Sequence, residues 1–364
     1  MSKIYNKDID KLKGLGIFLM VVGHSGSYFS SFIYLFHMPL FYFLSGYTFK
    51  ESNADNIKKF IKRRLKSLYI PFIRFGLLFI ILHNIFVKIN FYDVSLFYDK
   101  LTFRTNLFKN FIFISTEQLI GPFWFLTSIF ITNIIYVTIV RLFRNKNIKY
   151  INATIALLFI LNITFFSNNI KFNISILNYY FLMFRISCSG IIFFHIGNLC
   201  KKYSLSDKIC TNLVYFIVGI VYLYINTKYG NISMGSNQYG SSPTFFIVNA
   251  LIGIYLSYCV VKFISIRYIN NILIFLGKNT ITILALHIIS FKLVNYLQIK
   301  IYKYPIEYLS AFPYIDGSNG WWILYSFVGI IIPALLILLK YSILKLFNKS
   351  IIHIKCSIHR LNND

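Results

Sequence analysis

Residues 321–340 read WWILYSFVGIIIPALLILLK and carry no charged side chain before Lys340. A helix of about 20 apolar residues crosses the ~30 Å hydrocarbon core of a bilayer, so this segment predicts a membrane-spanning helix. Similar apolar runs recur along the whole chain of 364 residues, of which 57% are hydrophobic and only 13% are charged. This composition excludes an ordinary soluble protein and predicts an all-α, polytopic membrane protein.

Hydropathy along the chain predicts about ten transmembrane helices. The connections between them are short except at residues 88–122, 227–243 and 297–320, so we expect a single integral-membrane domain over residues 1–364. The predicted spans are residues 12–29, 31–49, 68–87, 123–142, 150–167, 180–200, 211–226, 244–264, 272–296 and 321–340.

The charge of the chain is strongly positive, with 37 Lys and Arg against 11 Asp and Glu and a formal net charge of +26. In a soluble protein this would suggest nucleic acid as a partner. Here the basic residues concentrate on alternate connections, above all in the 50–66 loop, and the positive-inside rule makes that side cytoplasmic. We therefore expect both termini in the cytoplasm and the lipid bilayer, not nucleic acid, as the partner. The Ile, Asn, Lys and Phe bias is typical of an AT-rich bacterial genome, so the predicted location is the bacterial cytoplasmic membrane.

A histidine lies deep in the first predicted span. His24 follows Lys13 by eleven residues, which is about 16 Å of helix rise and places it near mid-bilayer. Ionisable groups at this depth are costly and are candidates for function. A neutral imidazole accepts a proton near neutral pH, as a general base requires. A purely structural hydrogen bond to a neighbouring helix explains His24 alone equally well.

Two further histidines belong to the same region of the predicted bundle. His287 follows Lys278 by nine residues, in a helix that enters from the same side as the first span, so His24 and His287 are expected at similar depth. They suggest a shared polar cavity, although two unrelated histidines fit the sequence as well. His37 precedes Pro39, and it either lines the cavity or satisfies a backbone carbonyl that the proline leaves free.

Cationic residues near the cytoplasmic side are candidates for binding a polyphosphate through charge-assisted hydrogen bonds. Arg74 follows the basic 58–66 stretch by less than three helical turns, whereas Arg185 is expected nearer the outer face. The aromatic 88–122 loop, which contains Glu117, and the 227–243 loop are suited to docking a sugar, but the second is also explained as a plain solvated loop. Phosphate-loop, nucleophile-elbow, HExxH and CxxC motifs are absent from the sequence, and no metal site is predicted.

At these residues the sequence resembles acyltransferase family 3, the integral-membrane O-acyltransferases, and most of all their fucose-4-O-acetylase-like branch. The resemblance begins with KGLGIFLMVVGH at residues 13–24 and FHMPLFYFLSG at residues 36–46. It continues with the basic 58–66 stretch, PFWFL at residues 122–126, FFHIG at residues 193–197 and LGKNT at residues 276–280.

The resemblance implies transfer of an acyl group, usually acetyl from acetyl-CoA, to a hydroxyl of an exported carbohydrate. His24 matches the catalytic histidine of the family and Lys13 its basic partner, which is often arginine in other members. Arg63 and Lys66 match a basic pair that precedes the third span, with one lysine in place of arginine. The candidate cavity then includes His37, His287, Asn279, Trp124 and Glu117, and the acyl-CoA-binding candidates are Arg63, Arg64, Lys66 and Arg74.

The sequence thus predicts a membrane O-acetyltransferase that uses acetyl-CoA and needs no permanently bound cofactor. Its acceptor is expected to be a cell-surface polysaccharide or a lipid-linked saccharide precursor. Two other functions stay open at this point: a transporter or flippase for a glycan intermediate, since charged residues at depth also suit a substrate pathway, and a polysaccharide polymerase.

Overall fold

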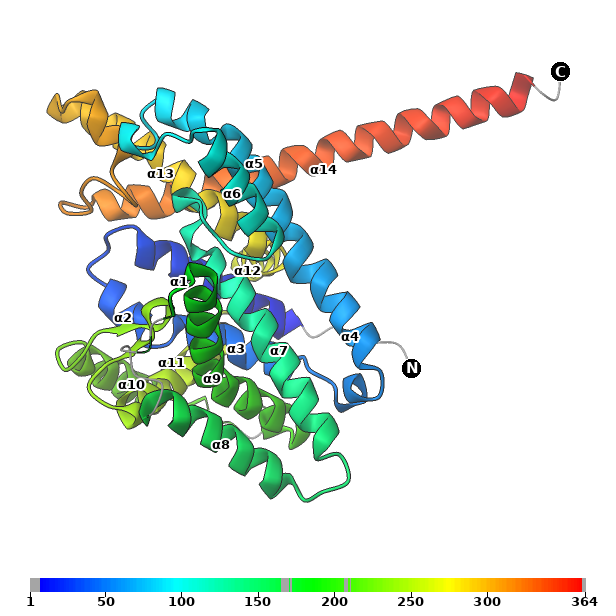
Figure 1. The fold of residues 1–364 in the computed structure, drawn as a ribbon, viewed down its shortest axis with the longest axis vertical. Coiled ribbons are helices and arrows are strands. Elements are labelled where there is room, and N and C mark those ends of the chain that lie inside the picture. Colours follow the sequence, from blue (N-terminus) through cyan, green and yellow to red (C-terminus); the bar gives the residue numbers. More distant parts are fainter. Residues whose placement is uncertain (1–6, 165–169, 171, 206–208, 210, 362–364) are drawn as a thin grey trace.

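The computed structural model describes residues 7–361 except 165–169, 171, 206–208 and 210, and it leaves the side chains of Thr164 and of residues 346–361 undescribed. The described chain is largely helical (Figure 1). Its helices are α1 (Lys7–His24), α2 (Ser30–Tyr34), α3 (His37–Tyr47), α4 (Ile57–Arg64), α5 (Ile70–Lys88), α6 (Lys100–Phe111), α7 (Trp124–Leu142), α8 (Ile148–Thr164), α9 (Ser175–Lys202), α10 (Leu213–Asn226), α11 (Pro243–Phe263), α12 (Arg267–Lys278), α13 (Thr280–Tyr302) and α14 (Trp321–Leu361). One small antiparallel hairpin, β1 (Ile232–Ser233) and β2 (Gln238–Tyr239), precedes α11.

Six helical segments in the described part of the chain are long and apolar enough to cross a membrane. They are Ile57–Lys88, Gln118–Leu142, Ser175–Lys202, Pro243–Phe263, Thr280–Tyr302 and Trp321–Lys345. The first of them joins α4 to α5 through a π-helical turn, Leu65–Tyr69. Helices α8 and α10 are apolar but shorter. The protein is therefore a multi-pass membrane protein, while ten spans and cytoplasmic termini stay predictions.

Two of the predicted spans are not single helices. The segment 31–49 is divided into α2 and α3, because the ring of Pro39 excludes a helical contact with the carbonyl of Leu35 but fits the first turn of a new helix. The segment 272–296 is divided at Asn279, where α12 ends and α13 begins. The side chain of Asn279 donates to the Phe275 carbonyl, 2.8 Å away, and this local bond competes with continuation of the helix. The predicted end of the fifth span, residues 165–167, lies outside the described residues.

Helix α1 lies inside the bundle, in contact with α2, α3, α11, α12, α13 and α14. In Figure 1, α8 to α11 lie below α1, and α13 and α14 lie above it. Its closest neighbour is α12, because both helices carry glycine where their backbones meet. A Cβ atom on Gly14 would overlap the Leu273 carbonyl oxygen, and one on Gly277 would overlap that of Asp10. This contact fixes the part of α1 that carries Lys13.

Candidate active site

The side chains of His24 and His287 meet at the end of α1. The Nδ1 atom of His24 lies 3.0 Å from the Nε2 atom of His287, and the two rings are nearly parallel, with an interplanar angle of 24°. His287 is fully buried, whereas His24 is partly exposed to a cavity. The structure therefore brings together the two histidines that the sequence placed at similar depth.

The hydrogen bonds of His287 assign the protons of both rings. Its Nδ1 atom lies 3.0 Å from the Leu284 carbonyl oxygen and 3.2 Å from that of Ile283, so this nitrogen carries a proton and donates it. In a neutral imidazole the other nitrogen is an acceptor. The Nε2 atom of His287 therefore accepts from the Nδ1–H group of His24, which leaves the Nε2 lone pair of His24 available. An imidazole held in this tautomer is suited to act as a general base.

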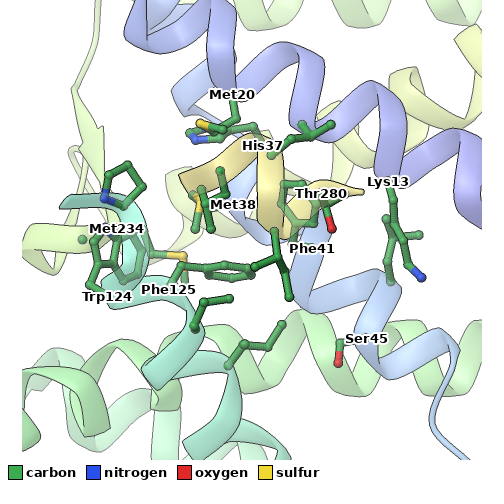
Figure 2. A pocket seen from close by; sticks show the side chains of 18 of the residues that line it. Lys13, Met20, His37, Met38, Phe41, Ser45, Trp124, Phe125, Met234 and Thr280 are labelled. Atoms are coloured by element: carbon green, nitrogen blue, oxygen red, sulfur yellow. The ribbon is translucent and has the colours of Figure 1, made fainter. Parts of the chain in front are cut away.

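A cavity of about 620 Å³ contains His24. Lys13 and Trp124 lie on opposite sides of it, and Met20, Met38, Phe41 and Phe125 lie between them (Figure 2). Its wall comes from α1, α2, α3, the α4–α5 segment, α7, the β1–β2 hairpin, α12 and α13. The cavity is therefore long, apolar in the middle, and different in chemistry at its two sides.

One side, which we call the basic end, is marked by Lys13, and Arg64 and Lys278 are the other two cations that line the cavity. Asp10 also lines it, with a carboxylate oxygen 3.6 Å from the Lys13 amine. Three cations against one carboxylate make this end suitable for a polyanion.

The other three predicted acyl-CoA-binding residues lie outside the cavity wall. Arg63 donates to the Asn53 side-chain oxygen at 2.6 Å. Lys66 and Arg74 are exposed and do not line the cavity. Among the basic residues that the sequence selected after the second span, only Arg64 lines the cavity that contains His24.

The opposite side, which we call the hairpin end, is formed by Trp124 and by the connection between β1 and β2. Ser233, Met234, Gly235 and Ser236 line it together with the indole ring. An aromatic face with hydroxyl groups beside it is a surface typical of carbohydrate sites, because the C–H face of a sugar packs on the ring and its hydroxyls find hydrogen-bond partners.

His37 also lines the cavity, beside Tyr34. Its Nδ1 atom lies 3.0 Å from the Ile33 carbonyl oxygen, at the break between α2 and α3. Tyr34 donates to the carbonyl of Gly23 at 2.8 Å, and this bond ties α2 to the last turn of α1 next to His24. His37 thus lines the cavity and also bonds a backbone carbonyl at the helix break, but that carbonyl belongs to Ile33 and not to Leu35, which lies four residues before Pro39.

Two predicted cavity residues lie elsewhere. Asn279 caps α12 and is not part of the cavity wall. Glu117 is buried and paired with His83, whose Nδ1 atom is 3.0 Å from its carboxylate, and it accepts from Tyr92 at 2.8 Å and from Tyr98 at 3.1 Å. Glu117 thus holds the 88–122 connection against α5.

The structure adds residues to the site that sequence reasoning did not select. Lys278 is the last residue of α12 and lines the cavity. Ser233 and Ser236 belong to the 227–243 connection that the sequence suggested for docking a sugar, but neither serine was selected individually, and Tyr34 of α2 was not selected at all. Within the described residues, no group of three or more His, Cys, Asp or Glu side chains is placed to hold a metal ion.

Comparison with known proteins identifies the family of the chain. A family model described as an acyltransferase domain, Acyl_transf_3, matches residues 6–340. No curated protein and no solved structure matches the chain significantly. The matched region includes the His24–His287 pair and both ends of the cavity. With its membrane-spanning helices and this match over nearly the whole chain, the protein belongs to the acyltransferase 3 family of membrane acyltransferases.

Proposed function

We propose that the protein transfers an acetyl group from acetyl-CoA to a hydroxyl of a cell-surface polysaccharide or of its lipid-linked precursor. The observation that carries this proposal is the His24–His287 pair, which leaves the Nε2 atom of His24 unprotonated at a cavity. The choice of acetyl and of a sugar hydroxyl is supported by the resemblance of the sequence to the fucose-4-O-acetylase-like branch.

The donor is assigned to the basic end. Acetyl-CoA carries several phosphate charges, and Lys13, Arg64 and Lys278 are the cations that line the cavity. Arg63, Lys66 and Arg74 stay candidates for contacts with the nucleotide outside it. The apolar middle of the cavity suits the uncharged pantetheine arm and the thioester. In this assignment the basic end faces the cytoplasm, where acetyl-CoA is made, and the membrane is the cytoplasmic membrane of a bacterium.

In the proposed reaction, the Nε2 atom of His24 removes the proton from the acceptor hydroxyl. The oxygen attacks the thioester carbonyl, a C–O bond forms, and the C–S bond breaks as the tetrahedral intermediate collapses. The imidazolium then protonates the departing thiolate, so the products are the O-acetylated sugar and CoA. His287 supports the charged ring through its fixed hydrogen bond. No metal or permanently bound cofactor takes part.

The test compares surface glycan from cells that carry the wild-type protein, the His24→Ala variant or no protein. Proton NMR before and after mild alkali measures O-acetyl groups, because alkali removes esters. An acetyl signal present only with the wild type supports the proposal. Equal acetylation in all three with altered glycan amount or length would replace it by a transporter or a polymerase, and acetylation that persists with His24→Ala would remove His24 from its role.

A further inference from the structure

The 227–243 connection is a folded element that ends at the cavity. Ile232 pairs with Tyr239 and Ser233 with Gln238 in the β1–β2 hairpin. The turn between the strands closes at Asn237, which has a φ of 56°, a left-handed conformation that asparagine tolerates better than most residues. Met234 is 4% exposed. The turn residues thus have a defined position beside the cavity, unlike those of a solvated loop.

The turn contacts the indole ring of Trp124. A Cβ atom on Gly235 would lie 2.9 Å from Cε2 and 3.0 Å from Nε1 of Trp124. Only glycine permits this approach, so the backbone of the turn and the indole form one continuous wall. Figure 2 shows Met234 beside Trp124 at this side of the cavity. The hydroxyls of Ser233 and Ser236, 3.2 Å apart, lie in the same turn.

The buried side chain of Arg185 fixes the position of the hairpin. Arg185 of α9 is 7% exposed, and its Nε atom donates to the Asn162 side-chain oxygen of α8 at 3.3 Å. The side-chain amide of Asn237 lies between the Arg185 guanidinium and the Tyr239 hydroxyl. It forms hydrogen bonds with both groups when its oxygen accepts from Arg185 and its nitrogen donates to Tyr239. Asn162 also donates to Ser189 at 2.7 Å. The network links α8 and α9 to the turn.

We propose that this hairpin, held by Arg185, is the acceptor-specificity element: it forms a subsite for one pyranose ring of the acceptor, with the ring packed on Trp124 and its hydroxyls bonded by Ser233 and Ser236. Arg185 acts as a positioning residue and does not touch the sugar. A guanidinium buried in a membrane-spanning helix is costly, and here it orients a turn that lines the cavity. The inference rests on the proposed glycan acceptor and identifies which residues recognise it.

The test separates recognition of the acceptor from recognition of the donor. Purified protein is assayed for CoA release with acetyl-CoA and with surface glycan taken from cells that lack the gene. The variants are Gly235→Ala, Arg185→Gln and Arg185→Lys. The control is Gly121→Ala, because a Cβ atom there meets only the Phe312 ring at an ordinary 3.7 Å. Size-exclusion chromatography confirms that each variant is folded.

We expect Gly235→Ala and Arg185→Gln to raise the KM for the glycan about tenfold or more, because a small displacement of a positioned group has a large effect. The KM for acetyl-CoA stays unchanged, Arg185→Lys recovers part of the loss, and the control behaves like the wild type. Equal increases in both KM values, or a loss of kcat alone, would overturn the inference. A wild-type protein without glycan-dependent CoA release would overturn the proposed function and this subsite with it, whereas normal transfer by all variants overturns the subsite alone.

Discussion

The Nδ1 atom of His24 lies 3.0 Å from the Nε2 atom of His287, and the two residues are 263 positions apart in the chain. The Nδ1 atom of His287 donates to backbone carbonyls of its own helix, so its orientation is set by α13 and not by the substrate. This arrangement makes His287 the residue that determines which nitrogen of His24 faces the cavity. It also predicts different effects for substitutions at the two positions.

Replacement of His24 by alanine removes the proposed base. General-base catalysis contributes about 10² to 10⁴-fold, so His24→Ala is expected to lower kcat to that extent with little change in either KM. His287→Ala leaves the base in place but frees its tautomer and orientation, and we expect a smaller loss, about tenfold to a hundredfold, also in kcat. Steady-state kinetics of CoA release measures both.

A third histidine provides the control for these variants. His195 lies in α9, where it pairs with Tyr136 and Asn152 and does not line the cavity. A folded His195→Gln variant is expected to keep wild-type kcat. A His24→Ala variant with normal kcat, or a His287→Ala variant that is less active than His24→Ala, would contradict the assigned roles.

The basic end predicts a charge-dependent KM for acetyl-CoA. Charge-assisted hydrogen bonds to phosphate are each worth about 1.5–3 kcal/mol, so Lys13→Gln, Arg64→Gln and Lys278→Gln are each expected to raise this KM about tenfold or more. Added salt screens these contacts and raises the wild-type KM as well. Kinetics with acetyl-CoA at two ionic strengths tests both points.

The same experiment distinguishes two groups of cationic residues that are candidates for binding acetyl-CoA. Arg63, Lys66 and Arg74 come from the sequence pattern, whereas Lys13, Arg64 and Lys278 line the cavity. If the cavity binds the phosphates, the second group has the larger effect on KM. Arg144→Gln is the control, because Arg144 is exposed and pairs with Asp55 at 2.8 Å. A result in which Arg74→Gln has a stronger effect than Lys278→Gln would move the donor site out of the cavity.

Depth along a helix was predictable from the sequence, but rotation about its axis was not. His24 and His287 were expected at one level because each follows a basic residue by a similar number of residues, although the break at Asn279 separates Lys278 from the helix of His287. Counting residues fixes a rise of about 1.5 Å per residue. It does not say which side of the helix packs against which neighbour. For the same reason, Arg63 and Lys66 matched a pattern yet lie outside the cavity wall, while the adjacent Arg64 lines it.

The hydropathy of the sequence did not reveal the two helix breaks. An average over about 20 residues is equally apolar whether a segment is one helix or two, so 31–49 and 272–296 were each predicted as continuous. Local chemistry decides them instead: Pro39 lies in the first turn of α3, and Asn279 separates α12 from α13. Lys278, which lines the cavity, is the last residue before the second break. The β1–β2 hairpin was likewise not predictable, because its position depends on Arg185 and Trp124, which are distant in sequence.

The contact between α1 and α12 predicts loss of stability on enlarging its glycines. Gly14→Ala and Gly277→Ala each place a methyl group against a backbone carbonyl, which has no rotamer with which to move away. Overpacking typically costs about 1–3 kcal/mol, so the Tm of the protein in detergent is expected to fall by several degrees. Gly121→Ala is the matched control. Unchanged Tm values for both variants would show that the helices separate without cost.

The buried pair of His83 and Glu117 gives the last prediction. The Nε2 atom of His83 lies 2.7 Å from the Leu96 carbonyl oxygen, and its Nδ1 atom lies 3.0 Å from the Glu117 carboxylate. Both nitrogens of His83 are thus engaged, and the ring links the Glu117 carboxyl group to the backbone of the 88–122 connection.

Removal of one member of a buried hydrogen-bonded pair leaves the other polar group without its partner, which costs about 1–3 kcal/mol. We expect His83→Gln and Glu117→Gln each to lower Tm by several degrees, and the double variant to lose less than the sum of the two, because the two side chains interact directly. The kcat of the protein that stays folded is expected to be unchanged, since neither residue lines the cavity. Additive losses of stability would mean that the two groups act independently, and a folded Glu117→Gln variant without activity would return Glu117 to the active site that the sequence first assigned to it.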